Sequence, residues 1–169
     1  PVVLIADSGA IVNSSSVQWS YVAAGTIDSV SPAEGQNGTV VVLRGSGMLG
    51  GGASVASVTL GGVEVTEVVS GNDSVIVVVA DGRSTAGSGD VVVTANTGAT
   101  TTKGSGWTYV APGEINNVSP GSGQQGTRVT ISGQNLLVGA DNVTSVLLGG
   151  TEARGIVSVS ATQIVVESG

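Results

Sequence analysis

Five of the eight asparagines in the sequence begin an Asn-x-Ser or Asn-x-Thr triplet in which x is not proline. This triplet is the acceptor for N-linked glycans in secreted proteins, where it marks a surface loop. Asn, Ser and Thr also gather in turns for conformational reasons, which is the competing explanation. The number of triplets favours glycosylation. The candidate sites are Asn13, Asn37, Asn72, Asn117 and Asn142.

The sequence offers almost no side chains for catalysis. It contains no cysteine and no histidine, and Lys103 is its one lysine. The chain therefore lacks thiolate nucleophiles, imidazole bases and the usual zinc ligands, and its Ser and Thr hydroxyls have no evident base to activate them. We expect no enzymatic activity, no catalytic residues, no metal site and no cofactor.

Two weaker patterns have simpler explanations. Residues 45–50 have the glycine spacing of a dinucleotide-binding fingerprint, but no helix is predicted after them, so a turn is favoured. Glu64, Glu152 and Asp141 could suggest a weak calcium site. Calcium requires six to eight oxygen ligands, and no loop here supplies more than about one carboxylate. Solvated turn carboxylates are the favoured interpretation.

The charge balance argues against two classes of partner. Five basic residues face twelve acidic ones, which gives a net charge of −7, and the arginines are scattered singly. Nucleic acids and anionic membranes attract basic patches, so we expect neither as a partner of these residues. The longest apolar run, residues 75–80, is also too short to span a bilayer.

The sequence repeats itself at a spacing of 88 residues. Trp19-Ser-Tyr-Val recurs as Trp107-Thr-Tyr-Val, Ile27-x-x-Val-Ser-Pro recurs from Ile115, and Gly35-Gln-x-Gly-Thr recurs from Gly123. Near the end of the middle repeat, residues 91–99 also resemble residues 2–10, at a spacing of 89. A fixed period of this length predicts a tandem array of domains.

The phase of the repeat predicts three parts: residues 1–22 as the closing strands of one domain, 23–112 as a complete domain, and 113–169 as the opening strands of a third. The two flanking parts are complementary fractions of one kind of domain. Neither is expected to bury its apolar face alone, so both should find partners outside this chain.

Strand signals dominate throughout. Short β-branched runs alternate with clusters of Gly, Asn, Asp and Ser, and no window has helical spacing of apolar residues. In the middle repeat we expect strands near 26–31, 38–45, 55–60, 63–69, 74–80, 90–96 and 99–110. About seven strands in one such repeat predict an all-β, immunoglobulin-like sandwich. Trp107 and Tyr109 share one face of the last strand, which we expect to face the core.

These motifs resemble the IPT/TIG domains, which are immunoglobulin-like modules. The ordered set is Ile-x-x-Val-Ser-Pro, then Gly-Thr-x-Val, a Gly-x-x-Leu-type turn, Val-x-Leu-Gly-Gly and a closing aromatic-x-Tyr-Val. The chain has Trp where the family more often has Phe in the closing strand. The resemblance implies tandem TIG-type sandwiches, one complete and two partial, without catalysis. Function does not follow from the fold alone.

The function expected from these features is mechanical. We expect an extracellular or cell-surface, N-glycosylated array that serves as a fibre, stalk or appendage. Its partners would be further copies of itself, joined head to tail, either within one longer chain or by strand donation between chains. The alternative is a plexin-like receptor or adhesin ectodomain that binds a protein or a carbohydrate. That alternative requires an exposed apolar or aromatic patch, whereas all four aromatic side chains are expected in cores.

Overall fold

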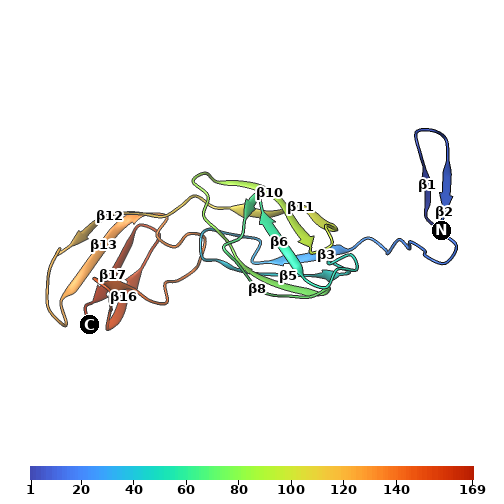
Figure 1. The fold of residues 1–169 in the computed structure, drawn as a ribbon. Coiled ribbons are helices and arrows are strands. Elements are labelled where there is room, and N and C mark those ends of the chain that lie inside the picture. The colour runs from blue at the N-terminus through green and yellow to red at the C-terminus, as the bar shows by residue number, and fades with distance from the viewer.

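The computed structural model describes residues 1–169 as strands, turns and loops without a helix (Figure 1). An N-terminal hairpin, a first sandwich and a second sandwich follow one another along the chain, with the first sandwich between the other two (Figure 1). The predicted all-β, immunoglobulin-like fold is confirmed.

The first sandwich consists of two sheets. One has the strand order β3-β5-β9-β8 and the other the order β4-β11-β10-β6-β7. All neighbours are antiparallel except β4 and β11, which run parallel. The strands are β3 (Thr26–Ser31), β4 (Glu34–Gly35), β5 (Val40–Ser46), β6 (Val55–Leu60), β7 (Val63–Glu64), β8 (Glu67–Gly71), β9 (Val75–Val79), β10 (Gly87–Ala95) and β11 (Thr100–Tyr109).

Alternating side chains of these strands fill the space between the two sheets. In β5, Val41 and Leu43 point inward and are fully buried, as are Ile76 and Val78 of the paired strand β9. The core contains 15 buried residues, so this sandwich is closed. The core is mostly aliphatic around Trp107 and Tyr109, which agrees with the prediction that these two rings face inward.

One predicted strand was wrong in extent. The segment 63–69 forms two short strands, because the chain crosses from one sheet to the other at Val65 and Thr66. Strand β7 pairs with β6 in one sheet, and β8 pairs with β9 in the other. The alternation of apolar residues breaks there, because the polar residues Thr66 and Glu67 follow one another.

The second sandwich repeats one sheet of the first and little of the other. Its sheet β12-β13-β17-β16 has the order of β3-β5-β9-β8, with the same irregularities 88 residues later. Opposite it lies only a two-stranded ribbon, and the buried core has four residues. The strands are β12 (Glu114–Ser119), β13 (Arg128–Gln134), β14 (Leu147–Leu148), β15 (Thr151–Glu152), β16 (Gly155–Val159) and β17 (Gln163–Glu167).

The N-terminal hairpin consists of β1 (Val3–Ile5) and β2 (Ile11–Asn13). It pairs only with itself, and every residue of both strands is exposed. An extended segment leads from it to the first sandwich (Figure 1). Two strands without a packed face are marginal in water, so the hairpin has apolar surface available for a partner.

Candidate functional site: the open face of the second sandwich

The complete sandwich shows how its last strand closes the core. Trp107 and Tyr109 are fully buried and meet edge to face, with ring centroids 5.7 Å apart. Both rings cover Gly61: a Cβ added there would lie 3.4 Å from the Tyr109 ring and 3.7 Å from the Trp107 ring. Gly61 has φ +56°, in the left-handed region that favours glycine. The Gly-Gly turn is therefore part of the floor on which the aromatic pair rests.

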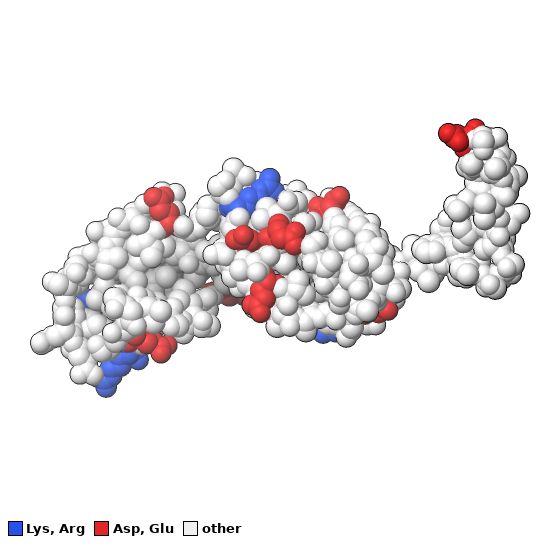
Figure 2. Space-filling model, viewed as in Figure 1, with Lys and Arg blue, Asp and Glu red and all other residues white.

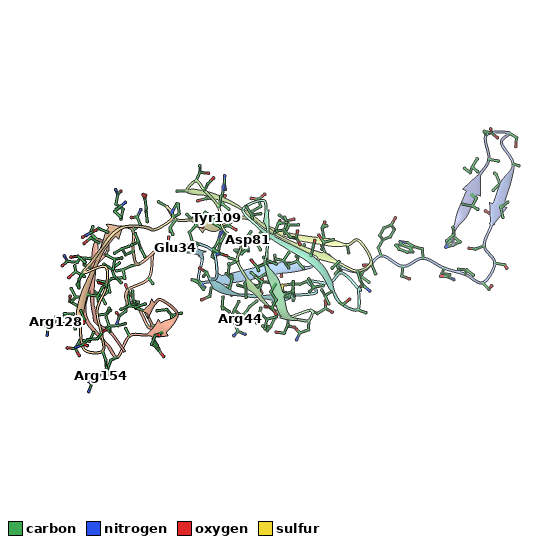
Figure 3. The ribbon with its side chains drawn as sticks, turned by 60° about the vertical axis from the view of Figure 1, so that its left-hand side comes forward. Glu34, Arg44, Asp81, Tyr109, Arg128 and Arg154 are labelled. Carbon is green, nitrogen blue, oxygen red and sulfur yellow. The ribbon has the colours of Figure 1, made fainter.

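Tyr109 lies at the end of the first sandwich that faces the second, as do Asp81 and Glu34 (Figure 3). Burial raises the pKa of its hydroxyl above the usual value, and the nearby Asp81 carboxylate raises it further. The Arg83 guanidinium, 5.9 Å from the ring centroid, acts in the opposite direction. The raised pKa favours the neutral form of Tyr109, as expected of a core side chain.

The equivalent place in the second sandwich is an open cavity of about 480 Å³. We call it the aromatic slot; its lining includes Val118, Gln124, Val129, Leu148 and Gly149. Gly149 corresponds to Gly61 and has nearly the same φ, +58°, yet a Cβ added there would meet nothing within 4 Å. The floor of the site is thus present, and the two rings that would cover it are absent.

A second cavity, of about 450 Å³, opens beside the aromatic slot along the interior of the same sandwich. Ten of its twelve lining residues are apolar, among them Ile131, Leu136, Val146 and Ile164. We call it the core groove. In the first sandwich the residues of β10 and β11 occupy this interior. The apolar groove and the more polar slot, which share Val118, Leu147 and Leu148, together mark the place where the second sandwich lacks two strands.

The two strands of the N-terminal hairpin pair with each other in the same antiparallel register as β10 and β11 do. Its tight turn also agrees: in each hairpin a glycine with φ near +85° lies at the tip, at Gly9 and Gly98, and the same two backbone hydrogen bonds close the turn. The pairs in β1–β2 are Val3–Asn13, Leu4–Val12 and Ile5–Ile11, and the pairs 89 residues later in β10–β11 are Val92–Thr102, Val93–Thr101 and Thr94–Thr100.

The aromatic pair that follows the hairpin is solvent-exposed, which differs from the expectation that all four rings lie in cores. Trp19 is 68% and Tyr21 is 92% exposed, because no second sheet lies over them. The two rings still meet edge to face, with centroids 6.0 Å apart. They therefore keep the mutual geometry of Trp107 and Tyr109 without the burial.

The junction between the hairpin segment and the first sandwich resembles the junction between the two sandwiches. A Cβ added at Gly51 would lie 3.8 Å from Val22, and one added at Gly139 would lie 3.5 Å from Val110, at positions 88 residues apart. A side chain at Gly25 would collide with the Gly47 carbonyl, as one at Gly113 would with the Asn135 carbonyl. The hairpin segment is thus attached to the first sandwich in the way the first is attached to the second.

The five candidate glycosylation sites are dispersed and exposed. They do not form a cluster: two lie in strands β2 and β12, and the other three lie in turns and loops. The side-chain oxygen of Asn72 accepts hydrogen bonds from the Ser74 and Val75 amides and stabilises its turn. The exposed residues are Asn13, Asn37, Asn72, Asn117 and Asn142.

The remaining patterns form no site in the structure. Residues 47–51 form the turn after β5, with no helix after them. No group of three or more acidic side chains is close enough to hold a metal ion, so Glu64, Glu152 and Asp141 remain separate. Charged side chains lie scattered on a mostly uncharged surface (Figure 2). No helix has the length and apolar character of a transmembrane segment.

Several solved structures share parts of this architecture at low similarity. A surface glycan-binding protein of Prevotella bryantii is 13% identical to this chain, with a TM-score of 0.40. The matched region covers 87% of this chain and 37% of the Prevotella protein. A protein from a Bacteroides ovatus mixed-linkage glucan utilization locus, in complex with a mixed-linkage heptasaccharide, is 18% identical, with a TM-score of 0.39. The matched region covers 86% of this chain and 37% of that protein.

A third structure, of a protein from a xyloglucan utilization locus of Bacteroides uniformis, is 22% identical, with a TM-score of 0.34. The matched region covers 86% of this chain and 42% of that protein. This chain therefore spans well under half the length of these proteins. At such scores and identities the likenesses identify neither a ligand nor a function for it.

No curated protein matches the sequence. The family model for the IPT/TIG domain, in contrast, matches twice, over residues 26–109 and over residues 114–169. The first match spans all strands of the complete sandwich, and the second spans the open one. The two matches together cover most of the 169 residues, and the chain belongs to the IPT/TIG family.

Proposed function

We propose that the chain is a structural unit of an extracellular or cell-surface array of TIG sandwiches. In this array each open sandwich is completed by a closing hairpin with the sequence and pairing of residues 1–22. The completing hairpin comes either from the same polypeptide in a longer chain or from another copy by strand addition. The function is mechanical and involves no catalysis.

One observation carries the proposal: β1–β2 has the register of β10–β11, and the second sandwich lacks the two strands that correspond to β10–β11. The inward positions also correspond. Leu4 takes the place of the buried Val93, and Val12 that of the buried Thr101, while Asn13 takes the place of the exposed Thr102. Docking would bury apolar side chains and leave the candidate glycan site at Asn13 in solvent.

The repeated junction supports an array that continues in one direction. A contact between the hairpin of one copy and the open sandwich of another uses two different surfaces, so it does not close on itself and extends into a filament. The linkers are short, and Pro112 restricts one of them. Glycans at the exposed sequon asparagines would cover the sides of such a filament.

Sedimentation velocity and electron microscopy of the 169-residue chain test this function. We expect the mass to increase with concentration and fibres to form with an axial repeat of about two small domains. Denaturing gels should release a 16.3 kDa polypeptide, plus any sugars. The matched control is Trp19→Ala/Tyr21→Ala, which should stay monomeric. A folded monomer at every concentration would contradict the proposal.

The exposed pair Trp19 and Tyr21 favours one other candidate function, a carbohydrate-binding module, because exposed Trp and Tyr offer a ligand a large apolar surface with a polar handle. The edge-to-face arrangement argues against it, since the two rings do not form one flat platform. Titration of Trp fluorescence with soluble glucans separates the candidates. A saturable change with the wild type that is lost in Trp19→Ala would support the binding module.

A further inference from the structure

In the complete sandwich, Gln36 fastens the end of the closing strand. Its side chain is buried, and Nε2 donates to the carbonyl oxygens of Val110, at 2.8 Å, and Arg83, at 2.7 Å. Its Oε1 accepts from the Arg83 amide at 3.1 Å. All hydrogen-bonding atoms of this amide are thereby used, and two separate segments are held against the turn that carries Gln36.

Beside Gln36 a short parallel ladder holds the same closing strand. Thr108 pairs with Glu34, and Tyr109 pairs with Gly35. The Thr108 amide donates to Ala33 at 2.9 Å, and the Val110 amide donates to Gly35 at 3.2 Å. The aromatic pair is therefore fixed by its backbone as well as by its packing.

The second sandwich contains the same turn without its partners. The Gln124 amide donates to Thr127 Oγ1 at 3.0 Å, as the Gln36 amide does to Thr39 Oγ1 at 3.1 Å, so the backbone is already in place. The Gln124 side chain, however, is exposed and has no hydrogen-bond partner. Ser122 and Gly123, the counterparts of Glu34 and Gly35, form no ladder.

We propose that residues 19–22 of a second copy bind in the aromatic slot, parallel to Ser122–Gly123, with Trp19 and Tyr21 over Gly149. Gln124 Nε2 then donates to the Val22 carbonyl of that copy, as Gln36 does to Val110. This inference rests on the proposed function and specifies its contact surface. It assigns to Gln124 the role of a latch.

The chemistry of the two surfaces agrees with this occupant. No charged side chain lines the aromatic slot, and residues 19–22 are likewise uncharged. Docking therefore buries no unpaired charge, which would be costly. The first sandwich lies between the hairpin and the second sandwich (Figure 1), so residues 19–22 do not reach the slot of their own chain.

Engineered cysteines test the register. The observed pair Thr108–Glu34 predicts that Ser20 of one copy lies beside Ser122 of the next, at a separation compatible with a disulfide. The chain has no native cysteine, so mild oxidation of Ser20→Cys/Ser122→Cys should give a ladder of covalent multimers on non-reducing gels. The matched control, Ser16→Cys/Ser122→Cys, and each single variant should give no ladder.

Two results with the cysteine variants and one with the wild type would overturn the inference. An assembling sample that forms no ladder shows that the slot or register is wrong, while the proposed function survives. An internal disulfide within one chain shows that the occupant is not a second copy. A wild-type chain that never assembles overturns both the inference and the function beneath it.

Substitution of Gln124 tests the latch. Gln124→Ala removes the donor to a carbonyl that becomes buried on docking, and we expect assembly to weaken about tenfold. Gln124→Glu keeps the shape but loses the donor, so it should fail as well, whereas the neighbouring exposed Gln125→Ala should assemble like the wild type. Equal assembly of Gln124→Ala and Gln125→Ala would overturn the latch.

Discussion

The two sandwiches share their first sheet and its irregularities, yet only one has a closed core. Ile27 and Ile115 occupy equivalent positions 88 residues apart, and their exposed fractions are 6% and 62%. The side of β3 that carries Ile27 is covered by β11, and Lys103 of β11 donates to the Ile27 carbonyl. β12 has no such neighbour. Burial at this position is therefore decided by the closing strands and not by the residue itself.

The same difference extends to backbone order. Residues 55–60 form a continuous strand because β10 pairs along them. Of the equivalent residues 143–148, only Leu147 and Leu148 are in a strand. Backbone amides and carbonyls need partners when they are removed from water, so a strand with no neighbour remains a loop. The last two strands of the sandwich therefore organise the strand beside them as well as the core.

The largest expected effect concerns the aromatic pair. Trp107→Ala should lower the free energy of unfolding of the first sandwich by about 3–5 kcal/mol, because a fully buried indole leaves a large cavity. Trp19→Ala should change it by less than about 1 kcal/mol while abolishing assembly. Chemical denaturation of both variants measures the difference. Similar losses in the two variants would contradict the assignment of the pairs to different environments.

The two equivalent isoleucines should also differ in their contribution to stability. Ile27→Ala should cost about 2–4 kcal/mol in denaturant unfolding, as buried Ile truncations do, whereas Ile115→Ala should cost little in dilute protein. At concentrations where the chain assembles, the cost of Ile115→Ala should increase, since docking covers this side of β12. A cost that is independent of concentration would show that the position stays open.

A smaller effect is expected at high pH. Because the pKa of Tyr109 is raised in the folded state, mainly by burial, its contribution to stability is full below the unfolded value near 10. That contribution is lost as the pH rises through the folded value, since only the unfolded chain ionises readily. The wild-type chain should therefore unfold at a lower temperature above pH 10 than at neutral pH. Tyr109→Phe should remove that part of the dependence.

Glycosylation should have the smallest effect on the fold. We expect glycans at Asn37 and Asn142, which are exposed and have Thr at the third position of the triplet. Glycosidase treatment in heavy-oxygen water followed by peptide mass spectrometry should find labelled Asp at both positions. Unmodified Asn at both, in protein from its natural source, would contradict the extracellular glycoprotein hypothesis.

Much of the fold could be predicted from β-branched runs and the repeat, because both are local or periodic signals. The crossing at Val65 and Thr66 was missed although two successive polar residues, Thr66 and Glu67, break the alternation there, because such a break can equally mark a bulge within one strand. The exposure of Trp19 was missed because burial depends on what lies opposite. The role of Gln36 was also missed. The recurring Gly-Gln at residues 35–36 and 123–124 was a visible signal, but only hydrogen-bond geometry gives it a meaning.

The most direct test of completion is hydrogen–deuterium exchange of residues 143–148 at increasing protein concentration, with residues 55–60 as the internal reference. In dilute protein, residues 143–146 should exchange rapidly, because no strand pairs with them. As the chain assembles, their protection should increase toward that of residues 55–60, since a docked hairpin supplies the missing neighbour. If the chain assembles and the amides of residues 143–148 still exchange as rapidly as in the monomer, completion of the open sandwich would be contradicted.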